Sequence, residues 1–199
     1  MANNTIITIG RQYGSGGREI GEKLAGELGF DYYDTMLLEK SSEGSGLSQR
    51  IIEEYDERLT NKWLNLAITG GAQDVNHLPL PLRAILSQFE VIEKIGKKGS
   101  AVIVGRCADY VLHEQKNVFS VFVHAETGRR IARVAERNHI SMEEAKKRIR
   151  NTDKQRASYY NYYTDKKWGV SDSYNMCIDR GLFGIDGAVA LLKNCVQSL

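Results

Sequence analysis

The chain has 199 residues and a formal net charge of +2, and 42% of its residues are hydrophobic while 26% are charged. This length and composition suffice for one sizeable core, so we expect a single domain over residues 1–199. So small an excess of positive charge does not favour a protein that binds nucleic acid through a strongly basic surface. We therefore expect no nucleic-acid partner.

No apolar run approaches the ~20 residues that a membrane-spanning helix requires, and the chain opens on polar residues rather than on a signal peptide. Cys107, Cys177 and Cys195 are odd in number and widely spaced, which favours reduced cysteines over a disulfide framework or a zinc site. The four histidines show no close metal-ligand spacing, so no protein-held metal is expected. These features indicate a cytoplasmic protein with no membrane partner.

Hydrophobic spacing predicts strands and helices in alternation. An apolar run from Thr5 leads into glycines, and a helix at 22–28 is expected to end at Gly29. Ser141 and Glu144 form a capping box that opens a later helix. Further strands are predicted at 30–33, 101–104, 118–123 and 174–178, and further helices at 49–66, 82–95, 141–155 and 184–196. The strand at 118–123 is apolar nearly throughout, which is typical of a parallel sheet covered on both faces. We therefore expect an α/β protein with a five-stranded parallel sheet.

Four glycines, Gly14, Gly16, Gly17 and Gly21, fall within eight residues after the first strand. Glycine permits positive φ, so the backbone N–H groups of such a loop can turn toward one point, where the following helix also presents its positive end. This pattern of strand, loop and helix predicts a site for an anionic ligand, most simply a nucleoside phosphate.

The loop departs from the P-loop pattern G-x-x-x-x-G-K-[ST]. Gly17 and Arg18 take the place of Gly-Lys, and Glu19 stands where Ser or Thr belongs. A dinucleotide-binding fingerprint would use Gly14, Gly16 and the ribose-binding Asp34, but it fails at Glu19. A glycine-rich turn that packs on its helix without a ligand is the third alternative.

Two segments interrupt the regular alternation. Residues 35–99 have the pattern of an inserted helical lobe. Residues 146–168 mix basic and tyrosine residues, and Arg150, Asp153 and Arg156 recur every three residues, which places them on one helix face. An acid between two arginines can orient them toward an anion, so we interpret this segment as a lid. A solvated helix face and a nucleic-acid surface are the alternatives.

Two phrases give the chain a resemblance to the cytidylate kinase-like family of nucleoside monophosphate kinases. Ile-Thr-Ile-Gly-Arg-Gln-Tyr-Gly-Ser-Gly-Gly-Arg-Glu-Ile-Gly followed by Phe-Asp-Tyr-Tyr-Asp resembles its opening, and Asp-Lys-Gln-Arg-Ala-Ser-Tyr-Tyr from Asp153 resembles its lid. The resemblance extends over essentially the whole chain. It implies a three-layer P-loop kinase fold with a five-stranded parallel sheet, a helical acceptor lobe over about 35–99 and a lid over about 146–168. It also implies phosphoryl transfer from ATP, with magnesium carried by the donor, to a small phosphorylated acceptor such as CMP.

The resemblance carries over to particular residues. Residues matching the donor side are Gly14, Ser15, Gly16, Gly17, Arg18, Glu19, Arg130 and Arg133. Residues matching the acceptor side are Asp34, Thr35, Lys40, Arg106 and Asp109. Residues expected to stabilise or orient the transferring group are Arg18, Arg150, Asp153 and Arg156. Cys107 and His124 stand where the family has acids, so cytosine preference is expected to be weaker than in a dedicated cytidylate kinase.

Two rival functions come from other classes. A nucleotide-binding regulator would bind ATP without turnover, which the Arg18 and Glu19 departures permit. A Rossmann-type dinucleotide enzyme would use Gly14, Gly16 and Asp34. The sequence indicates no particular oligomeric state and no particular acceptor.

Overall fold

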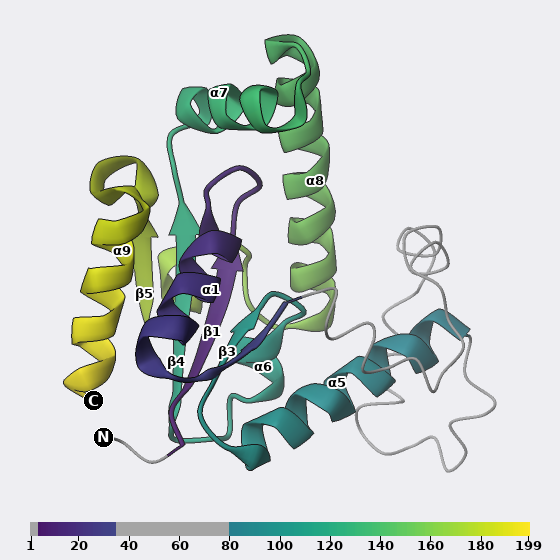
Figure 1. Cartoon of the computed structure of the whole chain (residues 1–199). Coiled ribbons are helices and arrows are strands. Elements are labelled where there is room, and N and C mark those ends of the chain that lie inside the picture. Colours follow the sequence, from purple (N-terminus) through teal and green to yellow (C-terminus); the bar gives the residue numbers. More distant parts are fainter. Residues whose placement is uncertain (1–3, 35–79) are drawn as a thin grey trace.

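The structure is a computed structural model that describes residues 4–34 and 80–199 (Figure 1). Its strands are β1 (Ile6–Arg11), β2 (Asp31–Tyr33), β3 (Ala101–Val104), β4 (Val118–His124) and β5 (Met176–Asp179). They form one parallel sheet in the order β2-β3-β1-β4-β5. The predicted five-stranded parallel sheet is confirmed, and the predicted helix at 49–66 lies outside the described residues.

The sheet order decides between two folds that the glycine loop alone left open. β1 pairs in parallel with β3 on one side and with β4 on the other, with Ile6 opposite both Ala101 and Val118. In the dinucleotide-binding fold the first and second strands are neighbours. Here β3 separates them, so the dinucleotide-binding alternative is wrong.

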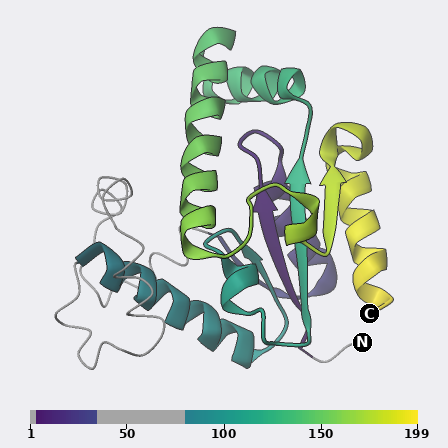
Figure 2. The ribbon, with the colours of Figure 1, turned by 180° about the vertical axis from the view of Figure 1, so that it is seen from behind.

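Helices cover both faces of the sheet because its strands alternate two apolar sets of side chains. On one face, Ile7, Ile9 and Val121 pack against α1 (Gly17–Leu28) and α9 (Arg180–Gln197). On the other face, Ile6 and Ile103 pack against α5 (Leu80–Lys98) and α6 (Ala108–Val111). Figure 2, from behind, shows α5, α6 and α8 on this second side. The result is the expected three-layer arrangement.

Helix α1 begins at Gly17, five residues before the predicted start at 22, because the glycine loop leads directly into it. Its C-cap, Gly29, is left-handed with φ 68°, as predicted. Helix α9 includes Gly184 at φ 68° and ψ −172°, a non-helical residue that divides it. Asp179 caps the first part by accepting a hydrogen bond of 2.7 Å from the Gly181 N–H.

Helices α7 (Thr127–Asn138) and α8 (Met142–Tyr163) are consecutive and cross at a steep angle, with α7 beyond the carboxyl ends of the strands (Figure 1). Ser141 Oγ accepts from the Glu144 N–H at 3.1 Å, which confirms the predicted cap. The helix continues well past the predicted end at 155, because Tyr160 and Tyr163 pack into a buried cluster with Phe122 and other side chains. No helix among the described residues is long and apolar enough to cross a membrane.

Candidate phosphate-binding site

The glycine loop connects β1 to α1 at the carboxyl end of the sheet's central strand. Gly14 has φ 79° and Gly16 has φ 87°, both in the left-handed region that glycine reaches without strain. A Cβ at Gly14 would lie 2.8 Å from Val134 Cγ2, so the loop also packs closely on α7. Because α1 begins at Gly17, its free N–H groups face the loop, as an anion-binding site requires.

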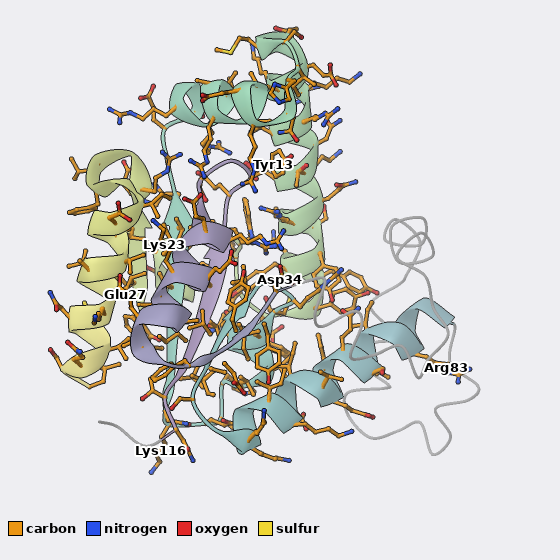
Figure 3. The ribbon with its side chains drawn as sticks, in the orientation of Figure 1. Tyr13, Lys23, Glu27, Asp34, Arg83 and Lys116 are labelled. Atoms are coloured by element: carbon orange, nitrogen blue, oxygen red, sulfur yellow. The ribbon has the colours of Figure 1, made fainter. Side chains whose placement is uncertain are left out.

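A cavity of about 370 Å³ lies beside this loop and is bordered by five structural elements. Its lining includes Arg11, Gly14, Gly16, Gly17, Arg18, Glu19, Asp34, Val104, Arg133, Arg137 and Arg156. Figure 3 shows Tyr13 on the loop near α7 and α8, and Asp34 lower down between α1 and α8. The cavity therefore combines the loop backbone, several arginines and the residue that follows β2.

Two charged residues in the first turn of α1, Arg18 and Glu19, border this cavity and form ion pairs. Arg18 Nη2 lies 2.6 Å from Asp34 Oδ2, with the Asp34 side chain buried and the Arg18 side chain 57% exposed. Arg133 Nη2 lies 2.5 Å from Glu19 Oε2. Arg18, the expected substitute for the P-loop lysine, thus has its guanidinium on Asp34, the carboxylate that the resemblance assigns to the acceptor side.

Arg130 and Asp153 bind the backbone of the glycine loop at Tyr13. Their side chains form an ion pair at 2.6 Å. Arg130 donates to the Tyr13 carbonyl at 3.2 Å and to the Ala125 carbonyl at 3.1 Å, and Asp153 accepts from the Tyr13 N–H at 2.7 Å. Both residues therefore position the loop, and neither lines the cavity.

Arg180, which sequence reasoning missed, holds the same loop from the opposite side. Its guanidinium donates to the Ser15 carbonyl at 2.8 Å and to the Gly14 carbonyl at 3.2 Å. The side chain of Ser15 is buried and donates to the Gln12 carbonyl at 2.9 Å. These bonds turn the carbonyls of Gly14 and Ser15 toward Arg180. The Tyr13 N–H is bonded to Asp153 and the Ser15 N–H to the Gln12 carbonyl, so the N–H groups that a ligand could use are those of Gly14, Gly16 and Gly17.

Two arginines from distant parts of the chain, Arg11 and Arg156, border the cavity, and Arg106, which the resemblance assigns to the acceptor side, is not among the lining residues. Arg156 donates to the Arg11 carbonyl at 3.1 Å, and its guanidinium lies 5.6 Å from the Tyr13 ring centre. Burial and the charges of Arg156 and Arg106 lower the pKa of Arg11 well below its usual value. Burial also lowers the pKa of Arg156, and Arg106 contributes in the same direction. Arg11 was missed because it ends an apolar strand, where nothing local marks it as functional.

The remaining predicted site residues lie elsewhere. Asp109 is buried and accepts a hydrogen bond of 2.6 Å from Tyr160 Oη, so it joins α6 to α8 rather than lining the cavity. Burial raises its pKa, although that hydrogen bond acts in the opposite direction. Arg150 is exposed on α8 and is not among the cavity residues. Thr35 and Lys40 lie outside the described residues.

The strand order β2-β3-β1-β4-β5, together with the glycine loop between the central strand and its covering helix, is that of a P-loop kinase fold. The family model for the cytidylate kinase-like family matches residues 6–181 of this chain. The chain therefore belongs to the cytidylate kinase-like family. A comparison of its sequence with curated proteins found no match.

Solved structures support the same fold. An uncharacterized protein from Eubacterium ventriosum is 30% identical, with a TM-score of 0.78 over 98% of this chain and 99% of that one. A shikimate kinase from Bacteroides thetaiotaomicron is 14% identical, with a TM-score of 0.55 over 98% and 99% of the two chains. A gluconokinase from Sinorhizobium meliloti is 14% identical, with a TM-score of 0.52 over 98% and 95%. The two kinases share the fold alone. Family membership supports a kinase of nucleotides or other small molecules, and it implies ATP, usually with magnesium.

Proposed function

We propose that this protein transfers the γ-phosphoryl group of ATP to a nucleoside monophosphate such as CMP, or to another small acceptor. The observation that carries the proposal is the cavity itself, where the glycine loop and the N-terminus of α1 face Arg11, Arg133 and Arg156. Phosphoryl transfer asks the protein mainly for alignment and charge neutralisation. A preorganised set of N–H groups and guanidinium groups supplies both.

On the donor side, the N–H groups of Gly14, Gly16 and Gly17 would hold the β- and γ-phosphates. Arg133 borders the same space from α7 and would exchange its ion pair with Glu19 for contact with the donor phosphates. Glu19 would then bind the donor's magnesium through water. Among residues 4–34 and 80–199, no cluster of His, Cys, Asp or Glu is suited to hold a metal ion. Magnesium would therefore be carried by the nucleotide, with most of its shell supplied by phosphate and water.

On the transfer path, Arg156 is the best-placed cation from α8. It borders the cavity and is fixed by its bond to the Arg11 carbonyl. A guanidinium in this position would stabilise charge that develops as the phosphoryl group moves. Asp153 would act by holding the loop through Tyr13, and Arg150 would contribute only through a movement of α8, because its side chain is exposed.

On the acceptor side, Asp34 and Arg106 follow β2 and β3, which lie side by side in the sheet. Arg106 would bind the acceptor's anionic group, and Thr35 and Lys40 would extend the site from the family-matching positions. Asp109 would keep α6 in place through Tyr160. Because Cys107 and His124 replace acids of the family, discrimination for cytosine would be modest.

A nucleotide-binding regulator is the second candidate. The observation in its favour is that Arg18 and Glu19, the two departures from the P-loop pattern, are both engaged in ion pairs with Asp34 and Arg133. A loop whose charged side chains pair with the protein could bind ATP and release it unchanged.

A single-turnover assay with γ-labelled ATP separates the two candidates. The purified protein, with magnesium present and in excess over ATP, would be offered CMP, UMP, AMP, GMP, shikimate and gluconate in turn. Label transfer to one of these acceptors supports the kinase. Tight ATP binding with no label transferred to any acceptor, or to water, would identify the regulator instead.

A further inference from the structure

Arg180, the first residue of α9, reaches the glycine loop from outside the cavity. Its Nε donates to the Ser15 carbonyl at 2.8 Å, and its Nη2 donates to the Gly14 carbonyl at 3.2 Å. A Cβ at Gly16 would lie 3.5 Å from Arg180 Nε, so the side chain also packs along the loop. Gly14 and Gly16 line the cavity, whereas Arg180 is not among the lining residues. Arg180 therefore contacts the backbone of the loop without entering the space that a ligand would fill.

The bond to Ser15 fixes the direction of an N–H group on the far side of the same peptide. A planar trans peptide holds its C=O and its N–H in opposite directions, and the described residues contain no cis peptide bond. The Ser15 carbonyl points to Arg180. The N–H of that peptide group belongs to Gly16 and therefore points away from Arg180, toward the cavity that Gly16 borders.

This orientation needs a restraint because glycine flanks the peptide group. Gly16 has φ 87°, and glycine populates positive and negative φ about equally. The peptide group between Ser15 and Gly16 could therefore rotate as a unit. Such a rotation would turn the Ser15 carbonyl toward the cavity, where its partial negative charge would oppose a bound phosphate instead of donating to it. Rotation would also break the bond to Arg180, so the guanidinium opposes it.

Arg130 restrains the loop in the same way from α7. It donates to the Tyr13 carbonyl at 3.2 Å, so the N–H of that peptide group, which belongs to Gly14, points away from Arg130. Arg130 also forms a largely buried ion pair with Asp153, and its removal would disturb the packing of two helices. Arg180 therefore offers the cleaner test of how loop orientation affects binding.

We propose that Arg180 is a positioning residue that raises the affinity of the glycine loop for the donor's phosphates by keeping the Gly16 N–H turned toward the cavity. This rests on the proposed function and deepens it, because it gives a residue outside the cavity a share in donor binding. Arginine suits the role since two nitrogens of one planar guanidinium reach two consecutive carbonyls at once. Lysine has a single ammonium on a flexible stem.

The test compares two variants of Arg180 in the full chain. Arg180→Met removes both hydrogen bonds at similar side-chain length, and Arg180→Lys keeps the charge without the planar fork. Lys193→Met is the matched control, because Lys193 lies farther along α9 and pairs with Glu27, at the opposite end of α1 from the loop. Calorimetry measures the Kd for Mg–ATP, and circular dichroism confirms that each variant is folded.

A spectroscopic measurement separates positioning from a general loss of packing. NMR of protein that is isotope-labelled in its glycines follows the Gly16 amide and, as an internal reference, the amide of Gly21. Gly21 lies on α1 where an added Cβ would be 2.9 Å from Val104, so its resonance reports how α1 packs on the sheet. A hydrogen bond to phosphate moves an amide proton resonance downfield.

The wild type and Lys193→Met should bind Mg–ATP alike, with a downfield shift of the Gly16 amide. Arg180→Met should bind Mg–ATP about tenfold more weakly or worse and should lose the Gly16 shift, because charge-assisted hydrogen bonds are the strong ones. The Gly21 resonance of the free variant should stay in place. Arg180→Lys should lie between the two, since an ammonium keeps the charge but does not hold both carbonyls in a fixed geometry.

Several results would overturn the proposal. These are equal Mg–ATP affinity in Arg180→Met and the wild type, an equal loss in Lys193→Met, or no Mg–ATP binding by the wild type. Full recovery in Arg180→Lys would assign the effect to charge alone, and a displaced Gly21 resonance in free Arg180→Met would assign it to packing. The kinase proposal fails separately, if the wild type transfers no label from ATP to any acceptor while Mg–ATP binding still depends on Arg180.

Discussion

Arg130 of α7 and Asp153 of α8 form an ion pair at 2.6 Å, and both residues also bind the backbone of Tyr13. The pair is largely buried, with side-chain exposures of 7% and 16%. This ion pair therefore joins α7 to α8 and holds the glycine loop in place through Tyr13.

Replacing Arg130 with Met should leave the Asp153 carboxylate buried beside an apolar side chain. Breaking such a pair from one side costs about 3 kcal/mol, because the remaining charge has lost its partner. Chemical denaturation should show this loss in the free energy of unfolding. The same change at Arg148, whose pair with Glu144 is about half exposed, should cost less than about 1 kcal/mol. Equal losses in both variants would argue that the Tyr13 network carries no special stability.

Replacing Arg156 with Ala should slow phosphoryl transfer far more than it weakens ATP binding. The guanidinium would meet charge that develops mainly in the transition state, so kcat should fall by on the order of 10² to 10³ while the ATP Kd changes little. Single-turnover rates and calorimetry measure the two quantities. Lys154→Ala, on an exposed position of the same helix, serves as the control and should retain its rate. Full turnover in Arg156→Ala would remove this residue from the transfer path.

Replacing Gly105 with Ala should destabilise the protein, because the side chain of Arg11 packs against this glycine. The new Cβ would displace the tip of the Arg11 side chain, a flexible group, while φ 86° adds backbone strain of about 1–3 kcal/mol. Chemical denaturation should therefore show a lower free energy of unfolding, although the protein still folds.

Gly29→Ala is the matched control for this variant. Gly29 has φ 68°, and no atom lies within 4 Å of an added Cβ, so Ala there should cost only the backbone strain, about 1 kcal/mol. Equal losses of stability in the two glycine variants would show that the approach of Arg11 to Gly105 adds nothing to the backbone strain.

The contribution of Asp109 to the free energy of unfolding should be larger at low pH than at high pH. Burial raises its pKa above the ordinary value of 3.8, so the folded state binds more protons than the unfolded state between these two pKa values. The free energy of unfolding from this group therefore falls as pH rises through that window, and the contribution is fully present below 3.8. Thermal unfolding of the wild type and Asp109→Asn across this range should show the wild type losing stability relative to the variant as pH rises. A constant difference would contradict the raised pKa.

The sequence alone identified the features that depend on neighbours in the chain. The apolar run at 101–104 matched β3 at both ends, and Ser141 with Glu144 capped α8 as predicted. The strand, glycine loop and helix also followed from local rules, because positive φ and helix dipoles are properties of a few consecutive residues. These features, with the resemblance to a known family, sufficed for the fold.

Tertiary structure decided which charged side chains meet, because that depends on residues far apart in the chain. Arg11 joins Arg106 and Arg156 only because β3 lies beside β1 and α8 reaches the loop. Arg130 likewise binds the loop only because α7 packs beside it. A helix pattern shows which face is charged, but it does not show what that face contacts. Local spacing determines an element and its faces, whereas desolvation and charge pairing depend on the packed neighbours that only the fold supplies.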